Sequence, residues 1–181
     1  MTYLFLGCRA LLLVVFVVAV AGKIRNRGAF AGFSSSIVAL RLLSRRRSVV
    51  AAAAVVGVEL ATTVMLAVTR TALVGLVVAI SLLLAFVTGI TVALRGGQAV
   101  PCRCLGASTA SLGPIHIVRN LALAAIGGAG LAAGLTATRA WPGHPGGTAV
   151  TLAMALVGAL LVIRFDDLAF LFTDTKRDSP S

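Results

Sequence analysis

The sequence predicts an all-α integral membrane protein, and three observations lead to this prediction. First, 59% of the 181 residues are hydrophobic and only 12% are charged, whereas a soluble domain is about 45–50% apolar and about 25% charged. Second, five stretches are long and apolar enough for the roughly 20 helical residues that a bilayer core requires. Third, the basic residues are unevenly distributed, and residues 23–47 hold seven of the 16. This composition excludes an ordinary cytosolic enzyme, a disordered tail and a coiled coil.

The five predicted spans cover residues 4–22, 48–69, 71–94, 115–137 and 148–165. Each is expected to be a helix, because backbone polar groups in lipid must be satisfied within their own segment. The first span contains Arg9, the second Glu59 and the fourth Arg119, while the third has no charge. Charged residues interrupt the fifth after Ile163, so it is either a short span or a longer helix to Phe172.

The connection at residues 23–47 is basic and contains no acid. Its middle, residues 29–43, is moderately apolar, so we expect an interfacial helix with arginines at the lipid headgroups. These charges follow the first span rather than precede it, which favours an uncleaved span over a signal peptide. The positive-inside rule places this connection in the cytoplasm of a multi-pass cell-membrane protein.

We expect one transmembrane domain over residues 1–173 and a short polar tail at 174–181. A polar loop at 95–113 contains two cysteines, and a plain loop follows at 138–147. The net charge of +11 does not indicate nucleic-acid binding, because that requires basic residues grouped on a water-exposed face. The partner indicated by composition is therefore the lipid bilayer.

Cys102-Arg103-Cys104 is the most informative short motif of the chain. Thiols two residues apart can close only a small, strained disulfide ring, and strained disulfides exchange readily. Arg103 and Arg119 would favour the thiolate form and so raise its reactivity. The alternative is two unrelated small residues in a loop; we favour redox or metal chemistry. Cys8, alone in the first span, is expected to be a buried, inert thiol.

Glu59 is the only acidic residue before Arg164, and it lies in the middle of a span. An ionisable group at that depth costs about 2.5–3.5 kcal/mol on insertion scales, so a compensating group is needed. Candidate hydrogen-bond donors are Lys23, Arg119 and Asn120. We favour a proton-carrying carboxylate in a polar site over a neutral glutamic acid that serves helix packing.

Two features of the fourth span, His116 and a GxxxG pattern, are expected to serve the structure of the protein and not its chemistry. His116, at its head, is expected at the membrane interface rather than as a metal ligand, since one His and two Cys make an incomplete ligand set. Gly130 and Gly134 form a GxxxG pattern, which indicates close helix packing within the chain or in a dimer.

Four patches, in their order and spacing, resemble a known family. They are Ala21-Gly22-Lys23 with Phe30, then Glu59-Leu60, then Pro101-Cys102-Arg103-Cys104-Leu105-Gly106, and then Arg119-Asn120-Leu121. Over residues 4–165 the chain resembles the methylamine utilisation protein MauE family, whose fold is similar to the DoxX-like four-helix bundle. It departs at Leu105, where the family usually has Phe.

The resemblance implies a DoxX-like bundle, to which the hydropathy adds a fifth transmembrane helix. It also implies a role in maturing a disulfide-rich amine dehydrogenase subunit, with a thioredoxin-like or secreted protein as partner. No cofactor or metal is assigned. The candidate site residues are Cys102, Cys104, Glu59, Lys23, Arg119 and Asn120.

Three hypotheses for function follow. The first is thiol–disulfide exchange at Cys102 and Cys104, with Glu59 and Lys23 handling protons. The second is a carrier of a small solute or soft metal ion that uses Glu59 and the thiols. The third is a non-catalytic membrane subunit. Disulfide chemistry belongs in an oxidising compartment, yet the charge rule places the cysteine loop inside; either the loop exchanges electrons on the cytoplasmic face or the rule fails here.

Overall fold

The computed structural model describes residues 1–39, 44–96, 113–136 and 143–164, and these residues form helices and short turns with no strand among them. A single 3-10 turn, η1 (Thr69–Thr71), connects the third and fourth helices. The α-helices are α1 (Thr2–Ile24), α2 (Arg27–Ala39), α3 (Arg45–Ala67), α4 (Ala72–Arg95), α5 (Pro114–Thr136) and α6 (Pro145–Ile163).

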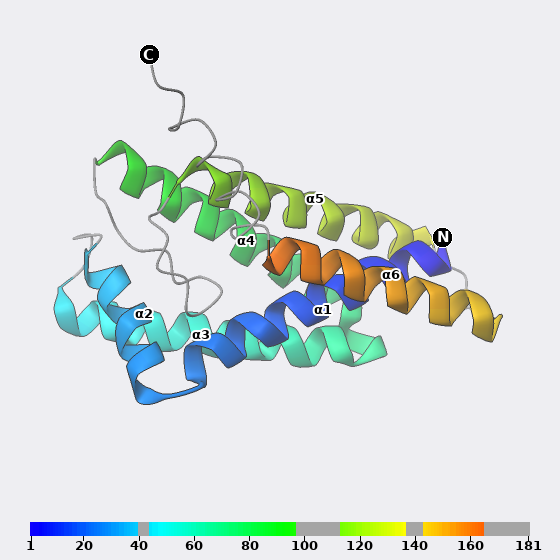
Figure 1. The fold of residues 1–181 in the computed structure, drawn as a ribbon, viewed down its shortest axis with the longest axis horizontal. Helices are drawn as coiled ribbons and strands as arrows, with labels where there is room; N and C mark the ends of the chain where they lie inside the picture. The colour runs from blue at the N-terminus through cyan, green and yellow to red at the C-terminus, as the bar shows by residue number, and fades with distance from the viewer. Residues whose placement is uncertain (40–43, 97–112, 137–142, 165–181) are drawn as a thin grey trace, which may run out of the picture.

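Five of these helices, all except α2, are long and apolar enough to cross a membrane. Figure 1 shows them running side by side along the long axis of the molecule, with α2 at one end. This confirms the prediction of an all-α protein with several apolar spans. In these five helices each boundary lies within three residues of the expected one, some inside and some beyond the apolar stretch, as is usual at helix ends.

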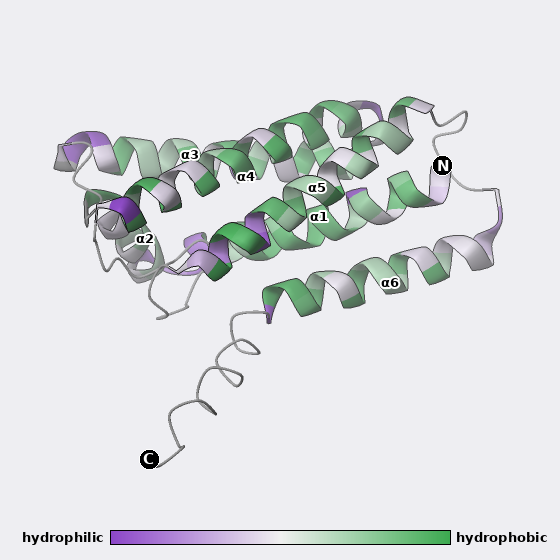
Figure 2. Ribbon diagram, turned by 90° about the horizontal axis from the view of Figure 1, so that it is seen from above, coloured by the Kyte–Doolittle hydropathy of each residue, from purple (hydrophilic) through white to green (hydrophobic). Residues whose placement is uncertain are grey.

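Helix α1 lies at the centre of the bundle and packs against α3, α5 and α6, while α4 packs against α3 and α5. The shared core contains Phe5, Leu12, Phe16, Leu76 and Leu123. Helix α6 lies on the flank of the bundle beside α1, as Figure 2 shows. Two small residues of α6, Ala155 and Ala159, are buried, and large apolar side chains cover its exposed surface. An exposed apolar surface of this kind fits a helix that faces lipid.

The GxxxG pattern of α5 packs against α1 and α4 within the same chain. A Cβ atom added at Gly130 would lie 2.7 Å from Cβ of Cys8, and one at Gly134 would lie 2.6 Å from Cδ2 of Leu73. Without a hydrophobic driving force between helices in lipid, such close backbone approach is a main source of association. Because Gly130 and Gly134 have no side chain, α5 can approach α1 and α4 this closely.

The C-terminal end of α3 is held by a side chain of α1. Nε of Arg9 donates a hydrogen bond of 2.5 Å to the carbonyl of Leu66, and Nη2 donates one of 2.8 Å to the carbonyl of Ala67. Nη1 also lies 3.3 Å from Oγ1 of Thr69. The last carbonyls of a helix have no partner inside it. The charge noted in the first span thus caps a neighbouring helix.

The basic connection differs in detail from the expected one. Helix α1 continues to Ile24, so Lys23 belongs to its last turn and is buried instead of lying in the connection. A helix was expected at 29–43, and the structure has α2 at Arg27–Ala39, with residues 40–43 outside the described part; its interfacial position stays a prediction. Lys23 can be buried in this last turn because its ammonium group bonds to Glu59 in the bundle interior.

The loop expected at 138–147 ends sooner than predicted, because α6 begins at Pro145. His144 is its N-cap, and Nδ1 of His144 accepts a hydrogen bond of 3.4 Å from the backbone N–H of Gly147. Proline is favoured at the first helical position because its missing N–H is not needed there. The Pro-Gly composition suggested a loop, but it is compatible with a helix start. The described part of α6 ends at Ile163, and the proposed extension to Phe172 lies outside the described residues.

Candidate functional site

Polar and ionisable side chains gather inside the bundle, toward the end at which α1 and α4 finish and α5 begins. Five of them are buried: Lys23 from α1, Glu59 from α3, and His116, Arg119 and Asn120 from α5. The three residues of α5 share one helix face, because positions three and four apart lie on the same side. Four of the six predicted site residues are therefore in this region.

Lys23 and Glu59 form a buried ion pair. Nζ of Lys23 donates to both carboxylate oxygens of Glu59, at 2.6 Å to Oε1 and 2.9 Å to Oε2. Each residue is only 1% exposed. Side chains on a helix point toward its N-terminus, so the lysine stem runs from the end of α1 back toward the middle of α3. Of the three candidate donors for Glu59, the structure pairs the carboxylate with Lys23.

Two aromatic rings surround the Lys23 ammonium group. Nζ lies 5.1 Å from the ring centroid of Phe33, on α2, and 5.7 Å from that of Phe86, on α4. Both distances are within the range of a cation–π interaction. Four helices therefore contribute to the surroundings of one ammonium group. Neither ring was predicted from the sequence, since a lone Phe in an apolar segment gives no signal of its contacts.

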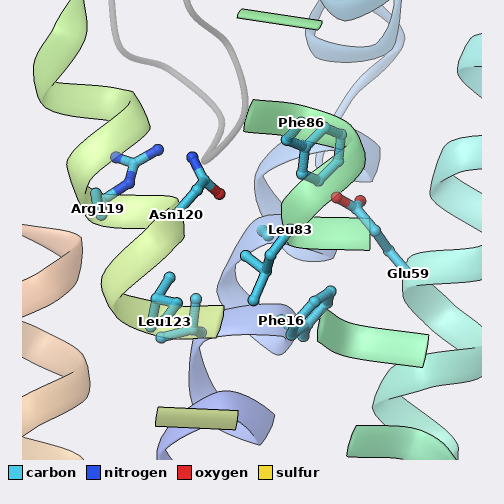
Figure 3. A pocket seen from close by; sticks show the side chains of 9 residues that line it. Phe16, Glu59, Leu83, Phe86, Arg119, Asn120 and Leu123 are labelled. Carbon is cyan, nitrogen blue, oxygen red and sulfur yellow. The ribbon is translucent and has the colours of Figure 1, made fainter. Parts of the chain in front are cut away.

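A small cavity of about 30 Å³ lies next to the ion pair. In Figure 3, Arg119 and Asn120 extend into it from α5 on one side and Glu59 from α3 on the other, with Phe86 and Leu83 of α4 between them. A volume of this size holds roughly one or two water molecules. Its full lining is Val15, Phe16, Ala19, Glu59, Leu83, Phe86, Arg119, Asn120 and Leu123. The cavity can therefore hydrate a carboxylate in the middle of the bundle.

The polar face of α5 is connected internally. Nδ2 of Asn120 donates a hydrogen bond of 2.7 Å to the carbonyl of His116, one turn earlier. The side chain of His116 is 1% exposed and lies inside the bundle, while its expected depth at the membrane interface stays a prediction. His116 lies on the same inward face of α5 as Arg119 and Asn120. It is therefore buried although it is close to the start of the helix. Among the described residues, no three His, Cys, Asp or Glu side chains gather as metal ligands would.

Cys102 and Cys104 lie outside the described residues. The chain leaves α4 at Gly96 and enters α5 after Gly113. Figure 1 places the end of α4, the start of α5 and helix α2 at the same end of the molecule. The third cysteine, Cys8, is buried in α1, as expected.

Comparison with known proteins gives one family. The family model described as methylamine utilisation protein MauE matches residues 1–137 of the 181. No curated protein and no solved structure matches the chain. The matched region includes α1 to α5 and therefore contains Lys23, Glu59 and the polar face of α5. The chain belongs to the methylamine utilisation protein MauE family.

Proposed function

We propose that this membrane protein assists the maturation of a partner protein by thiol–disulfide exchange at Cys102 and Cys104. Membership of the MauE family suggests an accessory membrane protein of methylamine utilisation. The proposal adds a mechanism to that role. The proposal is supported by a Cys-x-Cys motif in the sequence between α4 and α5 and by the buried polar cluster, which lies toward the end of the bundle where α4 finishes and α5 begins.

The proposed exchange has two steps. A thiolate of the partner attacks the Cys102–Cys104 disulfide, which gives a mixed disulfide and releases the second loop thiolate. A second partner thiolate then attacks the mixed disulfide, so that the partner gains a disulfide and the loop becomes a dithiol. A thioredoxin-like protein in its disulfide form accepts the electron pair and restores the loop disulfide. The two protons released with the partner's thiols are balanced by the two taken up when the thioredoxin-like protein becomes a dithiol.

The buried cluster supports this chemistry in two ways. The positive charge of Arg119, near the start of α5, favours thiolate over thiol in its vicinity. The carboxylate of Glu59, beside a cavity with room for water, supplies a group that can hold a proton within the bundle. Lys23 holds the Glu59 carboxylate in place by hydrogen bonds, and Asn120 bonds to the carbonyl of His116 on the facing helix α5. Burying ionisable groups in a membrane carries a free-energy cost, which makes Lys23, Glu59 and Arg119 candidates for a functional role.

Trapping a mixed disulfide tests the proposal. Cys102→Ser and Cys104→Ser variants each keep one loop thiol, so at least one is expected to accumulate a covalent complex with a partner. The complex should run as a larger band on a non-reducing gel and disappear on reduction. Cys8→Ser, which removes the cysteine buried in α1, is the matched control and should trap nothing.

The other two functions predict different results. Thiol-dependent binding of a soft metal ion, without any disulfide, would support the carrier. Full activity of a variant with Glu59→Gln, Cys102→Ser and Cys104→Ser combined would support a non-catalytic subunit. Either result, together with the absence of a trapped complex, would refute the exchange mechanism.

A further inference from the structure

Exposed arginines are concentrated at one end of the bundle. Arg25 and Arg27 lie where α1 passes into α2, and Arg46 and Arg47 lie in the first turn of α3. Helix α2 packs against both α1 and α3, so these four residues belong to neighbouring elements. We call them the basic surface. In Figure 2 the hydrophilic colour is strong at the start of α3.

The position of the basic surface along the membrane normal is fixed by the apolar helices. The apolar part of α1 ends at Ile24, and that of α3 begins after Arg47. The four side chains therefore lie at the level of the lipid headgroups rather than in the hydrocarbon core or the bulk solvent. Guanidinium groups form paired hydrogen bonds with phosphate oxygens.

The described residues offer little negative charge of their own. Their single acid, Glu59, is buried and bonded to Lys23. The other four acids of the sequence are at positions 166, 167, 174 and 178, outside the described part. At headgroup depth, the phosphates of anionic lipids are the negative groups present at the highest local concentration.

Helix α2 connects this surface to the interior. Its first residue is Arg27, and its buried Phe33 contacts the Lys23 ammonium at 5.1 Å. A ligand that holds α2 against α1 and α3 from outside therefore also holds Phe33 against the ion pair. Because Arg27 and Phe33 belong to the same helix, a ligand on Arg27 also limits the movement of Phe33 away from Lys23.

We propose that Arg25, Arg27, Arg46 and Arg47 form a binding site for anionic phospholipid headgroups, and that lipid bound there holds α2 in place with Phe33 on Lys23. This site is independent of the cysteine chemistry. Each basic residue near an anionic membrane surface changes affinity by about fivefold. Removal of two arginines should therefore weaken lipid binding by about 25-fold.

The full-length protein in nanodiscs provides the test. Retention of phosphatidylglycerol over phosphatidylcholine is measured by native mass spectrometry of the wild type and of an Arg46→Gln, Arg47→Gln variant. We expect the wild type to retain phosphatidylglycerol and the double variant to lose most of that preference. Arg70→Gln is the matched control, because Arg70 is exposed in η1 at the opposite end of α3 and should leave the preference unchanged.

Hydrogen exchange tests the link to α2. The amides of Arg27–Ala39 should exchange more slowly in phosphatidylglycerol than in phosphatidylcholine nanodiscs for the wild type and for Arg70→Gln, but not for the double variant. Equal retention of both lipids, or an equal loss of preference in Arg70→Gln, would overturn the proposed site. Lipid retention without any change in α2 exchange would overturn its role in holding Phe33.

Discussion

Lys23 and Glu59, 36 residues apart, place an ammonium 2.6 Å from a carboxylate oxygen in the interior of a membrane helix bundle. The pair joins the end of α1 to the middle of α3, and rings from α2 and α4 lie beside it. Charges in such an environment carry a desolvation penalty, which is offset only when both partners are present. The pair is thus a point at which four helices depend on one another.

Removal of one member of the pair should destabilise the fold strongly. Lys23→Met leaves the Glu59 carboxylate buried without its ammonium partner, and breaking a buried pair in this way costs about 3–5 kcal/mol. Unfolding by sodium dodecyl sulfate in mixed micelles, followed by circular dichroism, measures the change. A double variant, Lys23→Met with Glu59→Leu, should recover much of the loss because no buried charge remains. Equal stability of Lys23→Met and wild type would contradict this account.

Arg9 should contribute to stability through the end of α3. Arg9→Met removes hydrogen bonds to the carbonyls of Leu66 and Ala67 and should cost about 1.5–3 kcal/mol, the range for hydrogen bonds to charged groups. Arg9→Lys keeps the charge but not the planar guanidinium, so it should recover only part of the loss. The same unfolding measurement compares the two variants. Full recovery by lysine would show that charge, and not the paired geometry, is what matters.

The glycines of α5 allow a matched comparison. Gly130→Ala would place a Cβ 2.7 Å from that of Cys8, whereas a Cβ at Gly128 meets nothing within 4 Å. We expect Gly130→Ala to cost about 1–3 kcal/mol through overpacking. Gly128→Ala should be neutral or stabilising by up to about 1 kcal/mol, because alanine favours the helix. If both variants have the same stability, close approach of α1 and α5 is not important for folding.

The sequence predicted the helices well because their signal is local. Twenty apolar residues in lipid have few alternatives to a helix, so the spans appear in the hydropathy alone. The sequence also indicated that Glu59 needs a hydrogen-bond donor. The free-energy cost of a carboxylate in a span depends on its depth in the membrane, which hydropathy gives without knowledge of the neighbouring helices.

Partners across the bundle were harder to predict because they depend on helix rotation and depth. Lys23 was one of three candidate donors for Glu59, and hydropathy could not separate them. The inward position of His116 and the rings of Phe33 and Phe86 around Lys23 depend on how the helices pack. The sequence spacing shows that His116 shares a helix face with Arg119 and Asn120, but it does not show which side chains of other helices that face meets, so these contacts required the structure.

Cys8 should be unreactive in the folded protein, which simplifies every thiol experiment on this chain. Its side chain is 8% exposed, and its Cβ lies against Gly130 of α5. A maleimide can reach it only after α1 and α5 separate, which requires local or global opening. In a Cys102→Ser, Cys104→Ser variant, a maleimide-linked polyethylene glycol should label no cysteine before denaturation and one afterwards, as read from a gel shift. Fast labelling of this folded variant would mean that α1 and α5 are not closely packed at this position, and thiol reactivity in the wild type could not then be assigned to the loop alone.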